Sequence, residues 1–485
     1  MTPRLPRAFL TTFSALGYLA VILLLLWVSL GAAIPQEPQR ALVALGLIGV
    51  WRYGWWGLNG VRALLYRFAV YPRIKVQTAA VSRQRPPIAV VVTAYRIPGA
   101  LLLHVLRALF FASIRYGGTV TIALSVSTAS EAARAVRIAA RHIHNPQQTR
   151  LLVEVQDGSG KRAALANSLK AIRTQSPRPR VVALMDGDGI VPPDIFERCI
   201  PHFLATPALG ALTVNNRARG VSCPPFWESW INLKHRLRHF WMCSHALSGR
   251  LLVLTGRFSC FHGDIALSPR FINRLRHDAL QHWRFGTVRL VTGDDKSTWL
   301  GVLRRRAVMR YLPDVLLTSI EMERSGFFRG SAAKMRRWSG NMLRAGHMAL
   351  TERGLHVPLF IRAALVDQRL SIATGLLAPT LCLLALLHGY WHWAGVYLAW
   401  LLLSRLIWAL ALGGIQFRPS WPLLLLYNQV AGNLIKAHTL AHLDEQEWWQ
   451  NKHTTRQSRH RRHNNLLLFL AALTFLYSVV AITGL

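Results

Sequence analysis

The sequence predicts an α/β domain, built on a mostly parallel sheet with helices on both faces, inserted between transmembrane helices. Three observations lead to this fold class. Apolar runs long enough to cross a bilayer lie near both ends of the 485-residue chain. Between them, short β-rich runs alternate with helical stretches. The chain is also 52% apolar and carries a formal charge of +37, a combination typical of membrane proteins that keep Lys and Arg on the cytoplasmic side.

Two transmembrane helices are expected within residues 1–70. Residues 9–34 form an uncharged apolar run that exceeds the roughly 7–15 apolar residues of a signal peptide, which predicts an uncleaved anchor. A second span follows at 41–66, after the short polar connection PQEPQ. The positive-inside rule places the N-terminus in the cytoplasm and returns the chain there after the second span.

A cytoplasmic globular domain is expected over residues 71–326. Its predicted strands are apolar on both faces, which indicates a parallel sheet. The apolar stretch 100–112 is too short to span a bilayer and is expected to be a core helix. The predicted strands are IAVVVTAY, VTIALSVS, LLVEVQ, VVALMD and ALTVNN, and the predicted helices are EAARAVRIAARHI and KRAALANSLKAIR.

The C-terminal part is expected to return to the membrane. Residues 327–369 are assigned to interfacial helices, and 370–485 to a membrane region with about three spans. Within that region, 421–443 mixes leucines with amides and is expected to be an interfacial or re-entrant helix. The basic tract NKHTTRQSRHRRHNN would then be cytoplasmic. The three predicted spans are 370–392, 393–413 and 466–485.

Charge and cysteine content exclude several classes of protein. The charge implies contact with lipid head groups, a nucleotide substrate or an acidic polymer. No nucleic-acid partner is expected, because no zinc-finger, RRM or homeodomain pattern occurs. The five cysteines show no CxxC spacing, which argues against a zinc ribbon and a disulfide framework.

Two aspartates directly follow the apolar run VVALM. Ligands bind beyond the carboxyl ends of strands in open α/β sheets, and Asp186 and Asp188 lie there. Their spacing suits Mg²⁺ or Mn²⁺, which bind a couple of carboxylates plus phosphate oxygens. A calcium loop would need other residues at Ile190 and Val191. A turn that merely carries acids remains the alternative.

Three further segments favour the chemical interpretation. DGSGKRAALANSLKAI (157–172) opens a helix with Lys161, which suits a phosphate, although it lacks the pattern of a P-loop. TGDDKSTW (292–299) adds two acids, one of which could deprotonate an acceptor hydroxyl. KMRRWSGN (334–341) offers Arg for a pyrophosphate and Trp for a sugar ring, and its alternative is a membrane-interface anchor.

The order D-x-D, [ED]-D and [QR]xxRW between membrane spans resembles the processive membrane glycosyltransferases of family 2, which have a GT-A core. Cellulose, chitin and hyaluronan synthases belong to this group. Within it, the chain is most similar to the alginate polymerases, or mannuronan synthases. The resemblance covers most of the chain, in segments that include LTGRFSCFHGDIAL, FFRGSAAKMRRWSGNMLR and LLLLYNQVAGNLIKAH.

The resemblance implies a role for each site residue. Asp186 and Asp188 would bind the metal and the donor diphosphate, and Asp295 would be the general base with Asp294 beside it. The donor would also contact Tyr95, Lys161 and Arg337, and the acceptor would contact Trp338, Cys260, His262, Gly263 and Asp264.

Two positions depart from the family pattern. The [QR]xxRW motif begins with Lys334 in this chain, which keeps a donor but loses the amide or guanidinium geometry. The aspartate that usually follows the second strand and reads the nucleobase is absent, since ALSVSTAS offers only hydroxyls. This second departure is compatible with a guanine nucleotide.

The resemblance implies an inverting, metal-dependent polymerase of an acidic exopolysaccharide, with GDP-mannuronate as the preferred donor. The enzyme would lie in the bacterial inner membrane with its catalytic domain in the cytoplasm, and would pass the polymer across. It also implies a separate subunit carrying a cyclic-di-GMP-binding PilZ domain, and periplasmic export proteins. The alternatives are a synthase that uses a UDP-sugar, a transferase that adds one sugar to a lipid, and a non-catalytic basic membrane anchor.

Overall fold

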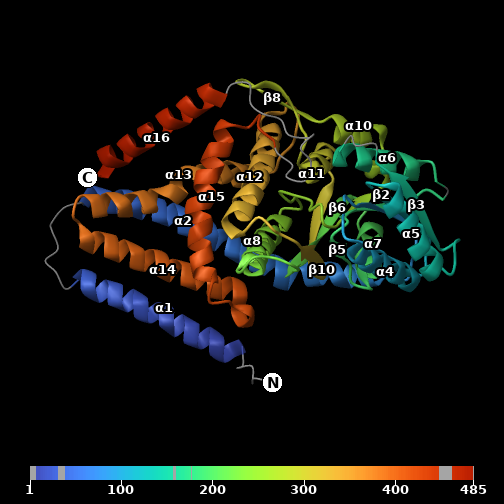
Figure 1. Cartoon of the computed structure of the whole chain (residues 1–485), viewed down its shortest axis with the longest axis horizontal. Coiled ribbons are helices and arrows are strands. Elements are labelled where there is room, and N and C mark those ends of the chain that lie inside the picture. The colour runs from blue at the N-terminus through green and yellow to red at the C-terminus, as the bar shows by residue number, and fades with distance from the viewer. Residues whose placement is uncertain (1–6, 31–38, 157–159, 176, 447–460, 484–485) are drawn as a thin grey trace.

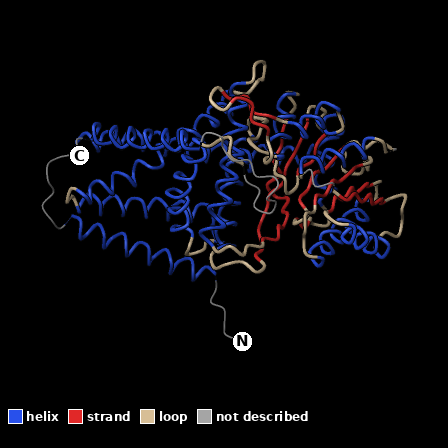
Figure 2. The backbone as a smooth tube through the Cα atoms, turned by 45° about the horizontal axis from the view of Figure 1, so that its top comes forward, coloured by secondary structure: helices blue, strands red, loops and turns tan. Residues whose placement is uncertain are grey.

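The structure is a computed structural model that describes residues 7–30, 39–156, 160–175, 177–446 and 461–483. Most of the predicted connection PQEPQ, residues 157–159 of the Gly-rich segment and much of the basic tract 451–465 lie outside the described residues. Long helices without strands form one side of the molecule, and the sheet with the helices that cover it forms the other (Figures 1 and 2).

Strands and helices alternate through the middle of the chain, and helices occupy both of its ends. The strands are β1 (Ile88–Thr93), β2 (Val120–Val126), β3 (Thr149–Val155), β4 (Val181–Asp186), β5 (Gly189–Ile190), β6 (Leu209–Gly220), β7 (Ser259–His262), β8 (Ala279–His282), β9 (Gly286–Arg289) and β10 (Val308–Glu321). The helices are α1 (Arg7–Leu30), α2 (Gln39–Leu65), the π-helix η1 (Tyr66–Val70), α3 (Tyr71–Ala79), α4 (Gly99–Tyr116), α5 (Ala129–His142), α6 (Lys161–Arg173), α7 (Ile195–Ala205), α8 (Trp227–Ala246), α9 (Gly263–Ala266), α10 (Pro269–His277), α11 (Asp294–Arg304), α12 (Phe327–Thr351), α13 (Leu359–Leu387), α14 (Trp391–Gly413), the 3-10 helix η2 (Gly414–Gln416), α15 (Trp421–Ala441) and α16 (Arg461–Thr483).

The main sheet has the strand order β3-β2-β1-β4-β7-β6-β10-β5. Helices α4, α5 and α7 cover one face, and α6, α10 and α11 cover the other (Figure 1). The predicted α/β fold is therefore confirmed. The sheet is mixed, however, because β7 runs antiparallel to both β4 and β6, and β5 runs antiparallel to β10.

The parallel centre of the sheet brings its carboxyl ends together. All six residues of β1 are buried, as expected for a strand covered on both faces. In register, Thr93 at the end of β1 pairs with Ser125 of β2 and with Asp186 of β4. This edge faces the membrane helices, so the acidic turn after β4 opens toward them.

Five long helices form the membrane side of the molecule: α1, α2, α13, α14 and α16 (Figure 1). Among the described residues, α13, α14 and most of α16 are long and apolar enough to cross a bilayer, and α1 contains a shorter apolar stretch at Thr12–Val28. Helix α15 crosses the other helices in Figure 1, and packs against α12, α13 and α14.

Two sequence predictions about helices have different outcomes. Helix α4 has the length and composition of a span, but half of it is buried, and it packs on α5 and α7 in the sheet core, as expected for 100–112. Residues 359–369, which were expected to be interfacial, lie in the same helix as the candidate span of α13 (Leu359–Leu387).

Helix α8 joins the two parts of the protein. It packs on strands β6 and β10 and also on helices α2, α14 and α15. The side-chain amide of Asn232 holds it to β6, with Oδ1 accepting from the backbone N–H of Ala218 and Nδ2 donating to the Ala218 carbonyl, both at 2.9 Å. On the other side, Trp227 and Trp230 are fully buried in an apolar cluster with α14 and α15 residues.

Candidate functional site

A cavity of about 1860 Å³ lies between the carboxyl edge of the sheet and the membrane helices. At one end it is lined by the predicted site residues Tyr95, Lys161, Asp186, Asp188, Asp294, Asp295, Arg337 and Trp338. At the other end it is lined by α2, α8, α13, α14 and α15. The structure therefore brings together eight of the twelve site residues predicted from the sequence.

Lys161 connects the two acidic motifs. Its Nζ lies 2.6 Å from Oδ1 of Asp186 and 2.8 Å from Oδ2 of Asp294. Burial alone would lower the pKa of Lys161, but the two carboxylates raise it above its ordinary value. The ammonium thus stays charged and fixes the spacing between the ends of β4 and α11.

The turn after β4 needs a glycine for a close backbone approach. A Cβ on Gly187 would lie 3.0 Å from Cα of Ala94, and its N–H donates to the Thr93 carbonyl at 2.9 Å. The turn is therefore pressed against the end of β1. This contact directs Asp186 and Asp188 into the cavity beside Tyr95.

Asp188 has the properties expected of a metal-binding carboxylate. Its Oδ1 is buried and has no hydrogen-bond partner among the described residues. Burial raises the pKa of Asp188 to about 6, helped by Asp186 and Glu321 and opposed by Arg257. An unpaired buried oxygen is costly, and a cation would satisfy it.

The residues present fit a divalent cation held partly by the substrate. No group of three or more His, Cys, Asp or Glu side chains within the described ranges could hold a metal alone. Asp186 and Asp188 supply hard oxygen ligands, and the remaining positions would be filled by diphosphate oxygens and water. Mg²⁺ or Mn²⁺ suits this donor set.

Asp294 and Asp295 open helix α11 but lie in different environments. Gly293 precedes them at φ 78°, and a Cβ there would approach Asn341 of α12 to 2.9 Å. Lys161 lowers the pKa of Asp294 despite its burial. Burial, followed by the charge of Asp294, raises the pKa of Asp295. Asp295 is therefore the better proton acceptor of the two.

A third acidic centre, at Glu321, was not predicted from the sequence. This residue ends β10, is 3% exposed, and bonds to both Arg257 and Lys334. Burial alone would raise the pKa of Glu321, but the two cations lower it to about 2. The sequence signal was an acid at the end of an apolar strand, in a chain with only 21 Asp and Glu residues.

Glu321 also accounts for the departure at the first position of the KxxRW motif. Lys334 lies about one turn before Arg337 and Trp338 on α12, and its ammonium pairs with Glu321 instead of pointing freely into the cavity. Arg337 has no hydrogen-bond or ion-pair partner in the described part of the chain. Its guanidinium is thus available for an anion.

Trp338 lies flat against a second tryptophan. Its ring stacks on Trp230 of α8 with centroids 6.0 Å apart and planes 12° apart. Nε1 of Trp230 donates to Oδ1 of Asn428 on α15 at 2.9 Å. A rigid aromatic wall therefore stands where the catalytic end of the cavity meets its membrane end, and such a wall suits a sugar ring.

Four predicted acceptor residues lie elsewhere. Strand β7 pairs antiparallel with β4, so His262 lies opposite Val181, at the amino end of β4 and away from Asp186. Asp264 is exposed and pairs with Arg178 at 3.2 Å. The residues outside the cavity lining are Cys260, His262, Gly263 and Asp264. Their position argues against the predicted acceptor role, because the antiparallel direction of β7 places Cys260 beside Ala183 in mid-strand and carries the chain from His262 onward to the opposite edge of the sheet.

Several known proteins are similar to this chain. Residues 86–341, just over half of the chain, match the family described as "Glycosyltransferase like family 2". The chain is 31% identical over 456 residues to the glycosyltransferase Alg8 of Pseudomonas syringae pv. tomato, covering 92% of this chain and 91% of the relative. It is also 31% identical to the glycosyltransferase Alg8 of Azotobacter vinelandii, covering 90% and 89%. Among solved structures, a mannosyltransferase from Pyrobaculum calidifontis, in complex with GDP-Man and Mn²⁺, is 16% identical, with a TM-score of 0.46 over 79% of this chain and 98% of that one.

Proposed function

Because the chain belongs to glycosyltransferase family 2, we propose that it is a processive, inverting polymerase of an acidic exopolysaccharide. The preferred donor is GDP-mannuronate, and the product is the polymannuronate chain of alginate. One observation carries the proposal. The carboxylates at the carboxyl edge of the sheet open into the same cavity that continues between the membrane helices.

The reaction transfers the sugar from the nucleotide diphosphate to a hydroxyl of the growing chain. The acceptor oxygen attacks the anomeric carbon from the face opposite the leaving group, the bond to the diphosphate oxygen breaks, and the anomeric configuration inverts. Asp295, whose pKa is raised by burial and by Asp294, takes the proton from the acceptor hydroxyl.

The leaving diphosphate carries most of the negative charge. Arg337 faces the cavity without a partner among the described residues and binds this charge with its fixed fork of N–H donors. Asp186 and Asp188 would hold a Mg²⁺ or Mn²⁺ ion, which would further stabilise the charge of the diphosphate. Lys161 holds Asp186 and Asp294 in place, and Tyr95 stands beside the nucleoside.

The membrane helices and the charge support the rest of the proposal. Candidate membrane spans follow the catalytic domain directly. This arrangement favours a polymerase that retains its growing product over a transferase that releases its product after adding one sugar. We place the enzyme in the bacterial inner membrane, multi-pass, with its catalytic domain in the cytoplasm. A separate PilZ subunit that binds cyclic di-GMP and periplasmic export proteins would complete the apparatus.

The decisive experiment is nucleotide release by the purified full-length protein in lipid, together with a cyclic-di-GMP-responsive subunit if one is encoded nearby. GDP-mannuronate, UDP-glucose, UDP-glucuronate and UDP-N-acetylglucosamine are offered in turn with Mg²⁺ or Mn²⁺. GDP release from the first donor alone, with a polymeric product, is expected. UDP release from another donor would keep the site chemistry but overturn the donor, and no release from any donor would favour a non-catalytic anchor.

A further inference from the structure

The membrane end of the cavity has a charge composition unlike that of the catalytic end. Helices α2, α8, α13, α14 and α15 contribute a single acid to its lining, Asp367, which pairs with Arg52 at 2.6 Å. The cations that they contribute to the lining are Arg52, Lys234, Arg238, Arg405 and Lys436. The passage beyond the reaction centre is therefore strongly cationic.

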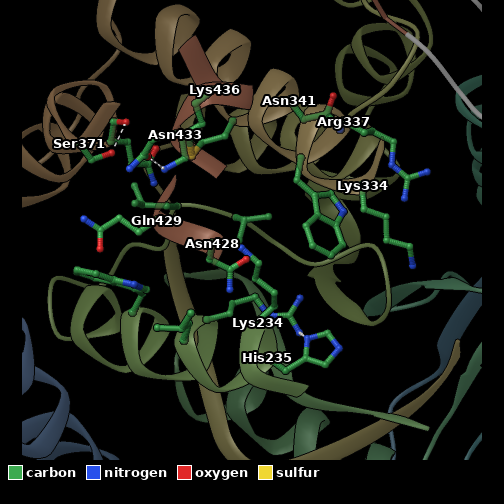
Figure 3. A pocket seen from close by; sticks show the side chains of 18 of the residues that line it. Lys234, His235, Lys334, Arg337, Asn341, Ser371, Asn428, Gln429, Asn433 and Lys436 are labelled. Carbon is green, nitrogen blue, oxygen red and sulfur yellow. Dashed lines mark hydrogen bonds between the residues drawn. The ribbon is translucent and has the colours of Figure 1, made fainter. Parts of the chain in front are cut away.

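Four of these five cations have no carboxylate within ion-pair distance among the described residues. Arg238 contacts His235 and Arg405 contacts Gln429, and the other two are lysines. Lys234 has no ion pair in the described ranges, and its Nζ lies 5.6 Å from the ring centroid of Trp230. Lys436 donates only to Oδ1 of Asn433, at 3.3 Å, among the residues that the structure describes. Figure 3 shows Lys234 on α8 and Lys436 on α15 on opposite sides of the cavity. Both lysines are half-buried, and charges removed from water are normally paired, so neither position has the directly bonded carboxylate that would be expected.

The residues between these two lysines are amides. Asn428, Gln429 and Asn433 project from α15 into the space between Lys234 and Lys436 (Figure 3). Because Oδ1 of Asn428 accepts from Trp230, its Nδ2 is left as the donor, and this nitrogen is buried without a partner among the described residues. Gln429 is satisfied by Gly375 and Arg405, but the cations and the unpaired Nδ2 of Asn428 form a lining suited to an oxygen-rich anion.

Lys234 lies close to Trp338, the tryptophan at which the acceptor sugar is proposed to bind. Trp230 stacks on Trp338, and Lys234 follows Trp230 by four residues on α8. This is about one helical turn, or roughly 5.4 Å along the axis. A polymer whose growing end lies against Trp338 therefore meets Lys234 within its next few sugar rings.

We propose that Lys234 and Lys436 bind carboxylates of the growing acidic polysaccharide, from opposite walls of the cavity, directly beyond the acceptor tryptophan. This inference rests on the proposed function and specifies the class of polymer that the passage accepts. Burial, followed by the charge of Lys436, lowers the pKa of Lys234 to about 7, and a carboxylate beside it would keep the ammonium charged.

The test measures binding of a short mannuronate oligomer to the full-length protein in lipid, which needs no turnover. The reference ligand is the same oligomer with its carboxyl groups reduced to alcohols. The variants are K234Q, K436Q and the double variant, with K234R and K436R as charge-retaining forms. K170Q, at an exposed lysine of α6, is the matched control.

The double variant is expected to weaken binding of the charged oligomer by about tenfold or more. Binding of the reduced oligomer should not change, and the arginine forms and K170Q should stay near wild type. Nucleotide binding at the other end of the cavity reports whether each variant is folded. Equal affinity of wild type and folded double variant for the charged oligomer would overturn the proposal.

The two proposals fail in different ways. If the wild type binds the charged oligomer and releases GDP from GDP-mannuronate, but the lysine variants behave like wild type, only the carboxylate-binding role is lost. If the wild type uses neutral donors alone, the acidic product is wrong, and the role of these lysines is overturned with it.

Discussion

The two ends of the cavity use cations in opposite ways. At the catalytic end, Lys161 bridges two aspartates, and Arg257 and Lys334 enclose Glu321. At the membrane end, Lys234 and Lys436 have no carboxylate within ion-pair distance in the described part of the chain. Paired charges hold protein groups at fixed positions, whereas unpaired ones are available to a ligand. The paired cations therefore set geometry at the catalytic end, where Arg337 is the exception, and the unpaired lysines are available for recognition at the membrane end, where Arg52 is the exception.

The largest expected effect comes from removing the base. Asp295→Asn should reduce polymer synthesis by about 10²–10⁴-fold, since the amide cannot take the acceptor proton. Donor binding should be nearly unchanged, because Lys161 contacts Asp186 and Asp294, not Asp295. Turnover and nucleotide binding are measured together. Retained turnover would remove Asp295 as the base.

Breaking the paired charges should affect stability more than recognition. Glu321→Gln leaves Arg257 and Lys334 buried without a counter-charge, which costs about 3–5 kcal/mol in the free energy of unfolding. Thermal or denaturant unfolding of the protein in lipid measures this. Glu323→Gln, a neighbouring acid bonded to Ser325, is the control and should lose much less.

The ion pairs of Glu321 with Arg257 and Lys334 predict how the free energy of unfolding depends on pH. The pKa of Glu321 is lowered from 4.5 to about 2 in the folded protein. Its contribution is therefore complete above pH about 4.5 and is lost as the pH falls toward about 2. The difference in unfolding free energy between wild type and Glu321→Gln should narrow across this window. A constant difference would show that the carboxylate charge is not what stabilises β10.

Metal binding should be lost on mild acidification. Because the pKa of Asp188 is raised to about 6, protonation competes with the cation below that pH, and Mn²⁺ affinity in the presence of GDP should fall about tenfold per pH unit. Mn²⁺ binding is followed between about pH 5 and pH 8. Asp188→Ala should weaken binding and flatten this dependence; unchanged metal binding in that variant would make the acidic turn structural.

The smallest effect is expected outside the cavity. Asp264 lies at the opposite edge of the sheet and makes an exposed ion pair with Arg178. Asp264→Asn should change stability by less than about 1 kcal/mol and should leave acceptor affinity unchanged. A marked rise in the KM for a mannuronate oligomer would restore the acceptor role that the register of β7 argues against.

Local sequence patterns were sufficient for much of the fold. The run KRAALANSLKAIR corresponds to α6, and VVALMD corresponds to β4. Each is an uninterrupted apolar or amphipathic segment, so its conformation follows from its own residues. The direction of β7 could not be predicted in this way, because a four-residue strand takes its direction from the neighbours it joins.

The site was predictable where its residues fall in motifs. Asp186, Asp188, Asp294 and Asp295 follow strand ends or open a helix. Glu321 was missed because its importance comes from Arg257 and Lys334, which lie 64 and 13 residues away. Likewise, the cationic lining depends on α8 and α15 lying side by side, which no local pattern shows.

The amide clamp of Asn232 on Ala218 has a mechanical consequence. Helix α8 is fixed to β6 by two hydrogen bonds, and the same helix carries Lys234 into the lining of the passage and Trp230 into the buried apolar cluster beside it. A displacement of α8 relative to β6 would therefore have to break both hydrogen bonds. The position of Lys234 in the passage is thus tied to the same sheet whose β4 ends in Asp186.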